Sequence, residues 1–491
     1  MTLVIFRPYS SYKAVFFLGI WAMGSTASYA QHVWIDPRAE SRLTLTDNAL
    51  LTLSDRQPDA VLSASAGLNV RAEGRRTRGA IDYSADYLYF LSDSSHDTRH
   101  QLFGTIDSEV WENHLTLGAR ASLQQQFLDQ RGSLSTSFAN RTSNRRLLQT
   151  YTGTALLKGG WRDVADWRVN YRFGLSKTPA DDLTDETLTS NFSDTTSHEV
   201  SASVGSGERF NNMNWRLFAS TRRVNRNLDV NNFRYDRAGG ELTYKFNRFF
   251  AINGSASYSH NDFQSDALSE DGFGWEGGFR WTPGRKLDLS IRAGKEGNRS
   301  TWYASLQHFF SARLDFSGSY QDTITANTLI TNDNVQNFQF SENIGLVDGS
   351  GQPIDEADPR FSYSDVDFRR RVAQGTLTWR HKRTQVYING SYELRTFDDG
   401  SGTAKSLGGS TGFEHNINRN TVLSGGLSYR KSRFEGSSRL DNYIEADLNW
   451  SKTISRYFIG VIGYAHSERQ SYQPGADLEE NTLTFYVRGT F

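Results

Sequence analysis

Hydrophobic and polar residues alternate with a period of two along most of the chain. From Trp167 to Ser176, the odd-numbered residues are apolar, whereas the even-numbered ones are polar or glycine. The same alternation recurs at 62–71, 287–293, 386–395 and 444–450. Because successive side chains of a strand point to opposite faces, each stretch predicts a β-strand with one apolar and one polar face. No segment has convincing helical periodicity, so we expect an all-β fold.

The connections between these strands distinguish a soluble sandwich from a membrane barrel, because strands of both would alternate in this way. Short connections fall at 73–77, 112–114, 246–249, 282–286, 310–313, 380–384, 416–420 and 451–456. Longer polar stretches lie between them, at 129–144, 178–196, 262–271, 325–365, 398–404 and 466–481. Short turns that alternate with long loops are typical of outer-membrane barrels. We predict one transmembrane, antiparallel, up-and-down β-barrel of about 22 strands (range about 18–24), with no plug domain.

The first thirty residues have the organisation of a secretory signal peptide. Arg7 and Lys13 provide a basic segment, residues 14–23 an apolar segment, and residues 28–30 a small-x-small cleavage motif. A membrane anchor is the alternative, but a spanning helix needs about 20 apolar residues. We expect residues 1–30 to be a cleaved signal peptide and residues 31–491 to form the barrel.

The end of the chain has the pattern of an outer-membrane assembly signal. Leu483, Phe485, Val487, Gly489 and Phe491 alternate with more polar residues, and the last residue is aromatic. Such a strand resembles the signal read by the bacterial barrel assembly machinery, so we assign that role to Phe491. The alternative is an ordinary edge strand. The predicted location is the outer membrane of a Gram-negative bacterium, with both termini periplasmic and with lipid and lipopolysaccharide around the wall.

Composition removes several classes of function. With 54 Lys and Arg against 55 Asp and Glu, the net charge is −1, so nucleic acid is not an expected partner. The chain has no cysteine, which excludes disulfides and thiolate metal sites. A mean hydropathy of −0.59 with 13% aromatic residues fits strands that have one wet face. Tryptophans near segment ends would form interfacial girdles, namely Trp111, Trp161, Trp275, Trp281, Trp379 and Trp450.

The polar strand faces predict the lining of the lumen. Charged side chains of both signs lie on them, so we expect a hydrated wall without strong ion selectivity. The candidates are Arg120, Arg168, Arg172, Arg292, Asp288, Glu393, Arg395, Glu445 and Asp447. The simpler interpretation is that these are solvated lumen residues without a further role. We expect no enzyme activity, cofactor or metal, because the ten histidines are scattered through predicted loops without ligand spacing, among them His96 and His100.

Short stretches of the chain resemble the outer-membrane β-barrel family associated with PEP-CTERM/exosortase systems of Gram-negative bacteria. They are Trp34-Ile35-Asp36-Pro37, Thr46-Asp47-Asn48-Ala49-Leu50, Gly278-Phe279-Arg280-Trp281-Thr282-Pro283-Gly284-Arg285 and Ala312-Arg313-Leu314-Asp315-Phe316-Ser317-Gly318-Ser319-Tyr320. The resemblance extends over nearly the whole mature chain. It implies a role beside exopolysaccharide biosynthesis, with exopolysaccharide and periplasmic export proteins as partners, and it carries no catalytic residues.

Different functions remain open at this point. The barrel could be a conduit or accessory component of exopolysaccharide export or biofilm matrix systems. It could instead be a non-conducting surface scaffold or adhesion barrel, or else a general porin or an electron-conduit sheath. For a conduit, the segment from Thr325 to Asp365 is the expected lid, because its apolar residues could dock inside the lumen. An extended hairpin above the membrane is the alternative for this segment.

Overall fold

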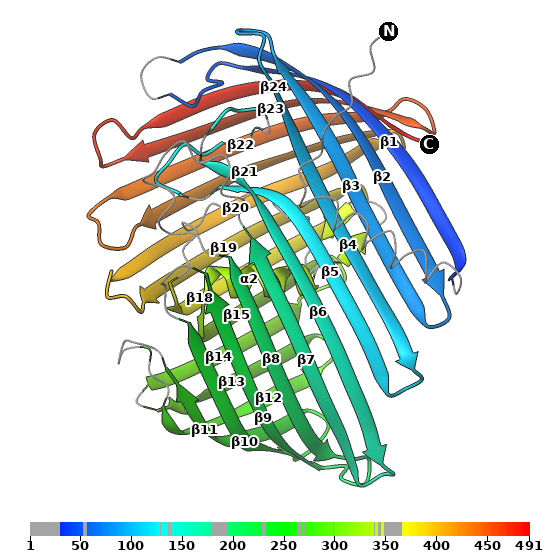
Figure 1. Cartoon of the computed structure of the whole chain (residues 1–491), viewed down its shortest axis with the longest axis vertical. Coiled ribbons are helices and arrows are strands. Elements are labelled where there is room, and N and C mark those ends of the chain that lie inside the picture. The colour runs from blue at the N-terminus through cyan, green and yellow to red at the C-terminus, as the bar shows by residue number, and fades with distance from the viewer. Residues whose placement is uncertain are drawn as a thin grey trace.

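A computed structural model shows a closed β-barrel with one short helix inside it (Figure 1). The structure describes residues 30–52, 56–127, 129–135, 137, 139–142, 144–177, 194–227, 232–262, 268, 271–297, 299–337, 339–341, 345–347 and 366–491. The signal-peptide prediction therefore lies outside the described residues, apart from residue 30. No helix among the described residues is long and apolar enough to cross a membrane.

Twenty-two strands form the barrel wall. The first fifteen are β1 (Ala30–Thr46), β2 (Asp59–Gly74), β3 (Thr77–Phe90), β4 (His96–Trp111), β5 (Leu115–Phe127), β6 (Arg145–Trp161), β7 (Ala165–Lys177), β8 (Thr195–Ser206), β9 (Met213–Arg226), β10 (Phe233–Lys245), β11 (Phe250–Asn261), β12 (Gly272–Gly284), β13 (Leu287–Glu296), β14 (Arg299–Phe309) and β15 (Leu314–Thr325). The others are β18 (Phe368–His381), β19 (Thr384–Phe397), β20 (Thr403–Asn418), β21 (Thr421–Arg433), β22 (Leu440–Thr453), β23 (Phe458–Ser471) and β24 (Leu478–Thr490).

Each wall strand pairs antiparallel with its neighbours along the chain, and β1 pairs with β24 from Arg38↔Thr490 to Thr46↔Thr482. This pairing closes the sheet, which leaves no long open edge of the kind that lipid would penalise. The predicted all-β, up-and-down barrel of 22 strands is confirmed. None of the described residues forms a separate plug domain.

The two ends of the barrel differ in the length of their connections. We call them the short-turn end, where strands join through links such as 75–76 and 382–383, and the loop end, which carries 47–58 and 128–144. The described chain begins and finishes at the short-turn end. The expected loop over 466–481 was wrong, because β23 and β24 extend through most of it and leave only 472–477 as a connection.

The outer face carries the exposed large apolar side chains. Along β22, for example, Leu448 is 48% exposed and pairs with Gly425 and Tyr464, and Tyr464 is also exposed. All six tryptophans named above are exposed, at 37–59%. Five of them lie near the short-turn end, and Trp275 lies near the loop end. This distribution matches interfacial girdles on a wall whose outer side faces lipid.

Between β15 and β18 the structure departs from an all-β prediction. α2 (Asn327–Asn337) lies inside the barrel, and β16 (Gln339–Ser341) pairs with β17 (Gly345–Val347) as a small hairpin. The expectation that no segment is helical was therefore wrong here. Of the apolar residues predicted to dock this segment, Ile330 packs against the wall, beside Phe368 and Phe397. The side chains of the other four, Phe338, Phe340, Ile344 and Leu346, lie outside the described part of the structure.

Candidate functional site: an obstructed interior and a charged chamber

The β5–β6 hairpin leaves the wall before it reaches the loop end. β5 pairs with β4 only as far as Leu102↔Leu123, and β6 pairs with β7 only from Gln149↔Lys177. β5 and β6 stay paired with each other up to Phe127↔Arg145. We call residues 124–148 the inner hairpin, because it turns into the barrel and reaches strands that are not its neighbours in the wall, such as β22 and β24 (Figure 1).

A buried carboxylate on β24 anchors the tip of the inner hairpin. Glu480, which is 1% exposed, accepts hydrogen bonds from Asn140 Nδ2 at 2.9 Å, from Ser135 Oγ, and from Thr46 Oγ1 of β1 at 2.8 Å. All of these donors are neutral. A buried charge needs such donors, because its desolvation is otherwise costly. Docking of the tip therefore satisfies Glu480.

Three arginines hold the backbone of the inner hairpin, one from β4, one from β23 and one from the connection before β22. Arg99 of β4 donates to the carbonyl of Asn140 at 2.8 Å. Arg439 and Arg469 donate to carbonyls near Arg131, with Arg439 Nη2 at 3.1 Å from the Arg131 oxygen. The described residues at the tip of the inner hairpin have no regular secondary structure, so their carbonyl oxygens are not paired in a helix or sheet. The three arginines supply hydrogen bonds to some of these oxygens.

Two small apolar clusters complete this contact. Ala139 packs with Val61, Leu88 and Phe90 of β2 and β3, all of them buried. Phe127 and Leu134 pack with Tyr443 of β22. The inner hairpin thus covers the part of the interior that is walled by β1–β4 and β22–β24.

An ion pair at the rim adds to this docking. Arg141 Nη2 lies 2.9 Å from Asp93 Oδ1 in the β3–β4 connection and 3.4 Å from Asp59 Oδ2. The hydrogen bond from Arg141 lowers the pKa of Asp93 below its ordinary value. The Arg141 guanidinium also lies 4.0 Å from the centre of the Phe90 ring. The pair therefore connects the inner hairpin to β2 and β3.

α2 crosses the middle of the barrel. At its start, Arg395 of β19 donates to Asn327 Oδ1 at 2.8 Å. Toward its end, Arg172 of β7 donates to Asp333 Oδ1 at 2.7 Å, and Ser176 Oγ lies 3.1 Å from Asn332 Oδ1. Because β7 and β19 lie on opposite sides of the wall, α2 bridges the interior (Figure 1).

The contacts near α2 also join β9 and β10 to the segment before β18. Ala326 and Leu329 pack with Val224 and Phe233. Arg226 and Asp367, both with less than 5% of the side chain exposed, form an ion pair at 2.8 Å. This contact narrows the barrel at α2.

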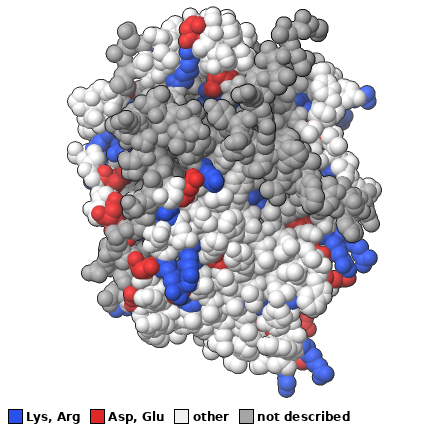
Figure 2. Space-filling model, viewed as in Figure 1, with Lys and Arg blue, Asp and Glu red and all other residues white. Residues whose placement is uncertain are grey.

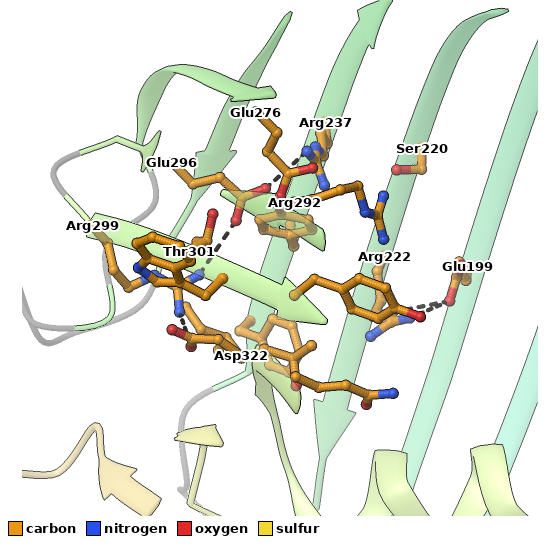
Figure 3. A pocket seen from close by; sticks show the side chains of 17 residues that line it. Glu199, Ser220, Arg222, Arg237, Glu276, Arg292, Glu296, Arg299, Thr301 and Asp322 are labelled. Atoms are coloured by element: carbon orange, nitrogen blue, oxygen red, sulfur yellow. Dashed lines mark hydrogen bonds and ion pairs between the residues drawn. The ribbon is translucent and has the colours of Figure 1, made fainter. Parts of the chain in front are cut away.

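A chamber of about 440 Å³ lies next to this narrowing, within the arc of the wall from β8 to β15. Its lining comes from β8–β10 on one side and β12–β15 on the other (Figure 3). Eight charged side chains line it: Glu199, Arg222, Arg237, Glu276, Arg292, Glu296, Arg299 and Asp322. Its volume lies within the range of about 300–1,000 Å³ that is typical of small-molecule sites.

The wall beside the chamber is split. β14 and β15 pair only from Ala304↔Tyr320 to Phe309↔Asp315, so their ends nearer the loops are separate. Asp322 occupies the split with 1% of its side chain exposed. It accepts from Arg299 at 3.0 Å and from Arg369 Nε at 2.8 Å. Ion pairs therefore replace backbone hydrogen bonds between these two strands.

The residues predicted to line the lumen lie in different surroundings. Arg172, Glu393 and Arg395 belong to the contacts of α2, where Arg395 Nε donates to Glu393 Oε1 at 2.8 Å. Arg292 lines the chamber, and Arg168 lines a second hollow near the short-turn end.

The remaining four contact polar neighbours. Arg120 pairs with Asp107 at 2.8 Å, and Asp288 accepts from Arg280 Nε at 3.0 Å. Glu445 accepts from Ser428 at 3.1 Å, and Asp447 accepts from Asn449 at 2.9 Å. Basic and acidic residues are also intermixed on the face drawn in Figure 2. Glu480, Asn140 and Glu276 could not be predicted from the sequence, since no local pattern distinguishes them from other polar residues.

The histidines are placed differently from the prediction. His96 and His100 lie in β4 and not in a loop, and their rings stack on Tyr87 and Tyr83 at 5.8 and 6.2 Å. Among the described residues, no three His, Asp or Glu side chains gather in a way that could hold a metal ion.

Comparison with known proteins identifies a related family for the last quarter of the chain. Residues 367–491 match the family described as "Putative beta-barrel porin 2". No curated protein matches the sequence.

Two solved receptors share the fold. A point mutant of the ferric enterobactin receptor PfeA from Pseudomonas aeruginosa is 9% identical, with a TM-score of 0.51 over 93% of this chain and 80% of the receptor. The siderophore receptor PirA from Acinetobacter baumannii is also 9% identical, with a TM-score of 0.50 over 94% and 81%. The chain is thus an integral outer-membrane β-barrel that resembles porins in its last strands.

Proposed function

We propose that this barrel is a gated channel for hydrophilic solutes, and that its cargo is a hydrated polysaccharide. The observation that carries the proposal is the way in which the interior is obstructed. The inner hairpin and α2 are held largely by hydrogen bonds and ion pairs to a polar wall, with only small apolar clusters. Water can replace such bonds at little net cost, at roughly 1 kcal/mol each. Segments of this kind are suited to leave the lumen, whereas a packed core is not.

The polysaccharide assignment rests on the lining and on the family resemblance. Interior side chains of both charge signs, together with Ser, Thr, Asn and Gln, offer donors and acceptors for sugar hydroxyls. The resemblance to barrels of exosortase systems adds exopolysaccharide export or biofilm matrix as the setting, with periplasmic export proteins and the barrel assembly machinery as partners. The proposal includes no enzymatic step, cofactor or nucleic acid, and it places both termini in the periplasm.

Planar-bilayer recordings test this function. Replacement of residues 129–143 by a short Gly-Ser turn should raise single-channel conductance, and so should removal of residues 332–359. The double variant should conduct more than either single one. The intact barrel, reconstituted in the same lipid, is the reference.

The competing function is a non-conducting surface scaffold. It would be favoured if the intact and the doubly shortened barrels both failed to pass ions while migrating as folded, heat-modifiable barrels. That result would contradict the channel.

A further inference from the structure

We infer that the chamber beside the β14–β15 split binds a sugar unit that carries a carboxylate, such as a uronic acid residue of a polymer. This inference deepens the proposed function and rests on it, because it names the class of polysaccharide that the channel would take.

Six of the eight charged side chains of the chamber are paired (Figure 3). Arg222 and Glu199 lie 2.7 Å apart, and Arg237 and Glu296 lie 2.8 Å apart. The third pair is Arg299 with Asp322, at 3.0 Å. These pairs neutralise one another and fix the shape of the walls.

Arg292 and Glu276 are the exceptions. Neither makes an ion pair or a hydrogen bond with the described part of the chain, and both are partly exposed to the chamber. The guanidinium of Arg292 lies over the ring of Tyr303, with 4.4 Å from Cζ to the ring centre. This contact holds the planar group in place and leaves its N–H donors free.

Two glycines make room for these two side chains. A Cβ atom on Gly278 would lie 2.7 Å from Cγ of Arg292, and one on Gly294 would lie 2.8 Å from Cγ of Glu276. In the β12–β13 register, Gly278 is opposite Arg292 and Gly294 is opposite Glu276. Each charged side chain therefore lies across the glycine of the neighbouring strand.

A free cation and a free anion in one chamber specify the ligand. The guanidinium fork matches a carboxylate in two parallel hydrogen bonds. The Glu276 carboxylate can only accept, so it suits hydroxyl donors and repels a second negative charge. A carboxylated sugar presents both groups on one ring, and Ser220 and Thr301 add hydroxyls to the lining. Dianionic inorganic phosphate keeps only one hydroxyl donor, and it would bring two negative charges beside the Glu276 carboxylate.

Isothermal titration calorimetry on the full barrel in detergent tests the inference. The probe is trigalacturonate, maltotriose is its neutral counterpart, and inorganic phosphate is a simple anion. Arg292→Gln should weaken trigalacturonate binding at least tenfold, and Glu276→Gln should weaken it by roughly threefold to tenfold. Arg292→Lys should give an intermediate loss, because it keeps the charge without the fork.

Arg168→Gln is the matched control. Arg168 is another barrel arginine that forms no ion pair with a carboxylate in the described part of the chain, but it lies in the second hollow. Its loss should leave the affinity unchanged within twofold. Heat-modifiable migration shows whether each variant folds. The detergent sample contains no lipopolysaccharide. Binding measured there therefore comes from the free sugar acid and not from the sugar core of surrounding lipopolysaccharide.

Three results would overturn the inference. The first is maltotriose binding as tightly as trigalacturonate, the second is full affinity in Arg292→Gln, and the third is phosphate competing as well as the sugar acid. Failure of the proposed function is distinguishable from failure of the site. Arg292-dependent binding in a barrel that never conducts would contradict the channel alone, whereas a gated channel without such binding would contradict the site alone.

Discussion

Gly489 leaves space for two aromatic rings where the chain closes the barrel. A Cβ atom at this position would lie 2.9 Å from ring atoms of both Phe458 and Phe491. Phe491 also stacks on Tyr457 at 6.3 Å, and its N–H donates to the carbonyl of Pro37 at 2.9 Å. The last residue therefore contacts β1, β23 and the turn before β23, as expected of a side chain with a role in closure.

Phe491→Asp should lower the amount of heat-modifiable barrel in the outer-membrane fraction, because a charge would replace the ring at the closing seam. Secretion across the inner membrane should be unchanged. Tyr472→Asp, at an exposed aromatic near the loop end, is the control and should insert normally. Equal insertion of both variants would mean that Phe491 has no role in assembly.

The two faces of β22 should respond differently to one added charge. Leu448→Arg places a guanidinium in lipid two residues from Trp450, and it should cost about 1–3 kcal/mol of folding free energy, between the values at the membrane centre and at the interface. Asn449→Arg puts the same group on the inner face, beside Asp447, and should cost far less. Urea titrations of the barrel in lipid vesicles measure both values. Similar losses would show that the register is wrong.

At the scale of elements, the wall strands were predictable and α2 was not. A strand between lipid and water must alternate, and residues such as Leu287, Leu289 and Ile291 display that requirement locally. α2 is surrounded by polar side chains of the wall. Asn327, Asn332 and Asp333 make its contacts with the wall, whereas a helix packed on a core would use apolar residues for them. Without an apolar stripe, helical periodicity gives no signal.

The position of α2 can be fixed chemically. The chain has no cysteine, so Ser176→Cys with Asn332→Cys would introduce the only pair of thiols. The replaced side chains are in hydrogen-bond contact, which places the new thiols close enough to cross-link after a small adjustment. Under oxidising conditions the channel should stay at its lowest conductance, and a reductant should restore openings.

Each single-cysteine variant should ignore both oxidant and reductant. If the oxidised double variant formed its disulfide and opened as often as the original chain, α2 would not control the passage of ions.

The chamber is a property of the whole molecule. Sequence alternation placed Arg292 on the inner face, but only the folded wall shows that side chains of β8–β10 and β12–β15 line one chamber. The inner hairpin is similar in this respect, because Asn140 and Glu480 are far apart in the sequence. No local pattern could have paired them. The sequence therefore predicted the wall and the sides of the strands, while contacts across the interior required the folded chain.

The docked inner hairpin should respond to acid through Asp93. Arg141 lowers the pKa of Asp93 in the docked state, so this ion pair contributes fully above the ordinary carboxyl pKa of about 4. Its contribution is lost progressively as pH falls below that value. Channel openings in planar bilayers should therefore become more frequent only as pH falls below about 4, and they should continue to rise toward lower pH.

Asp93→Asn removes this titration, so it should open more often at pH 7 and respond less to acid. An unchanged acid response in Asp93→Asn would exclude the pair as its source.

The inner hairpin and α2 are bonded to different strands of the wall, apart from the contacts that α2 makes with β5 and β6, and this has an electrical consequence. Each segment blocks a different part of the lumen, so for ion current they act as two gates in parallel and not as one gate in series. Movement of either one should produce its own discrete step, and the steps should add when both are displaced. A recording would then contain at least three levels above the baseline, and the ratio of the two smaller levels would measure how unequally α2 divides the lumen.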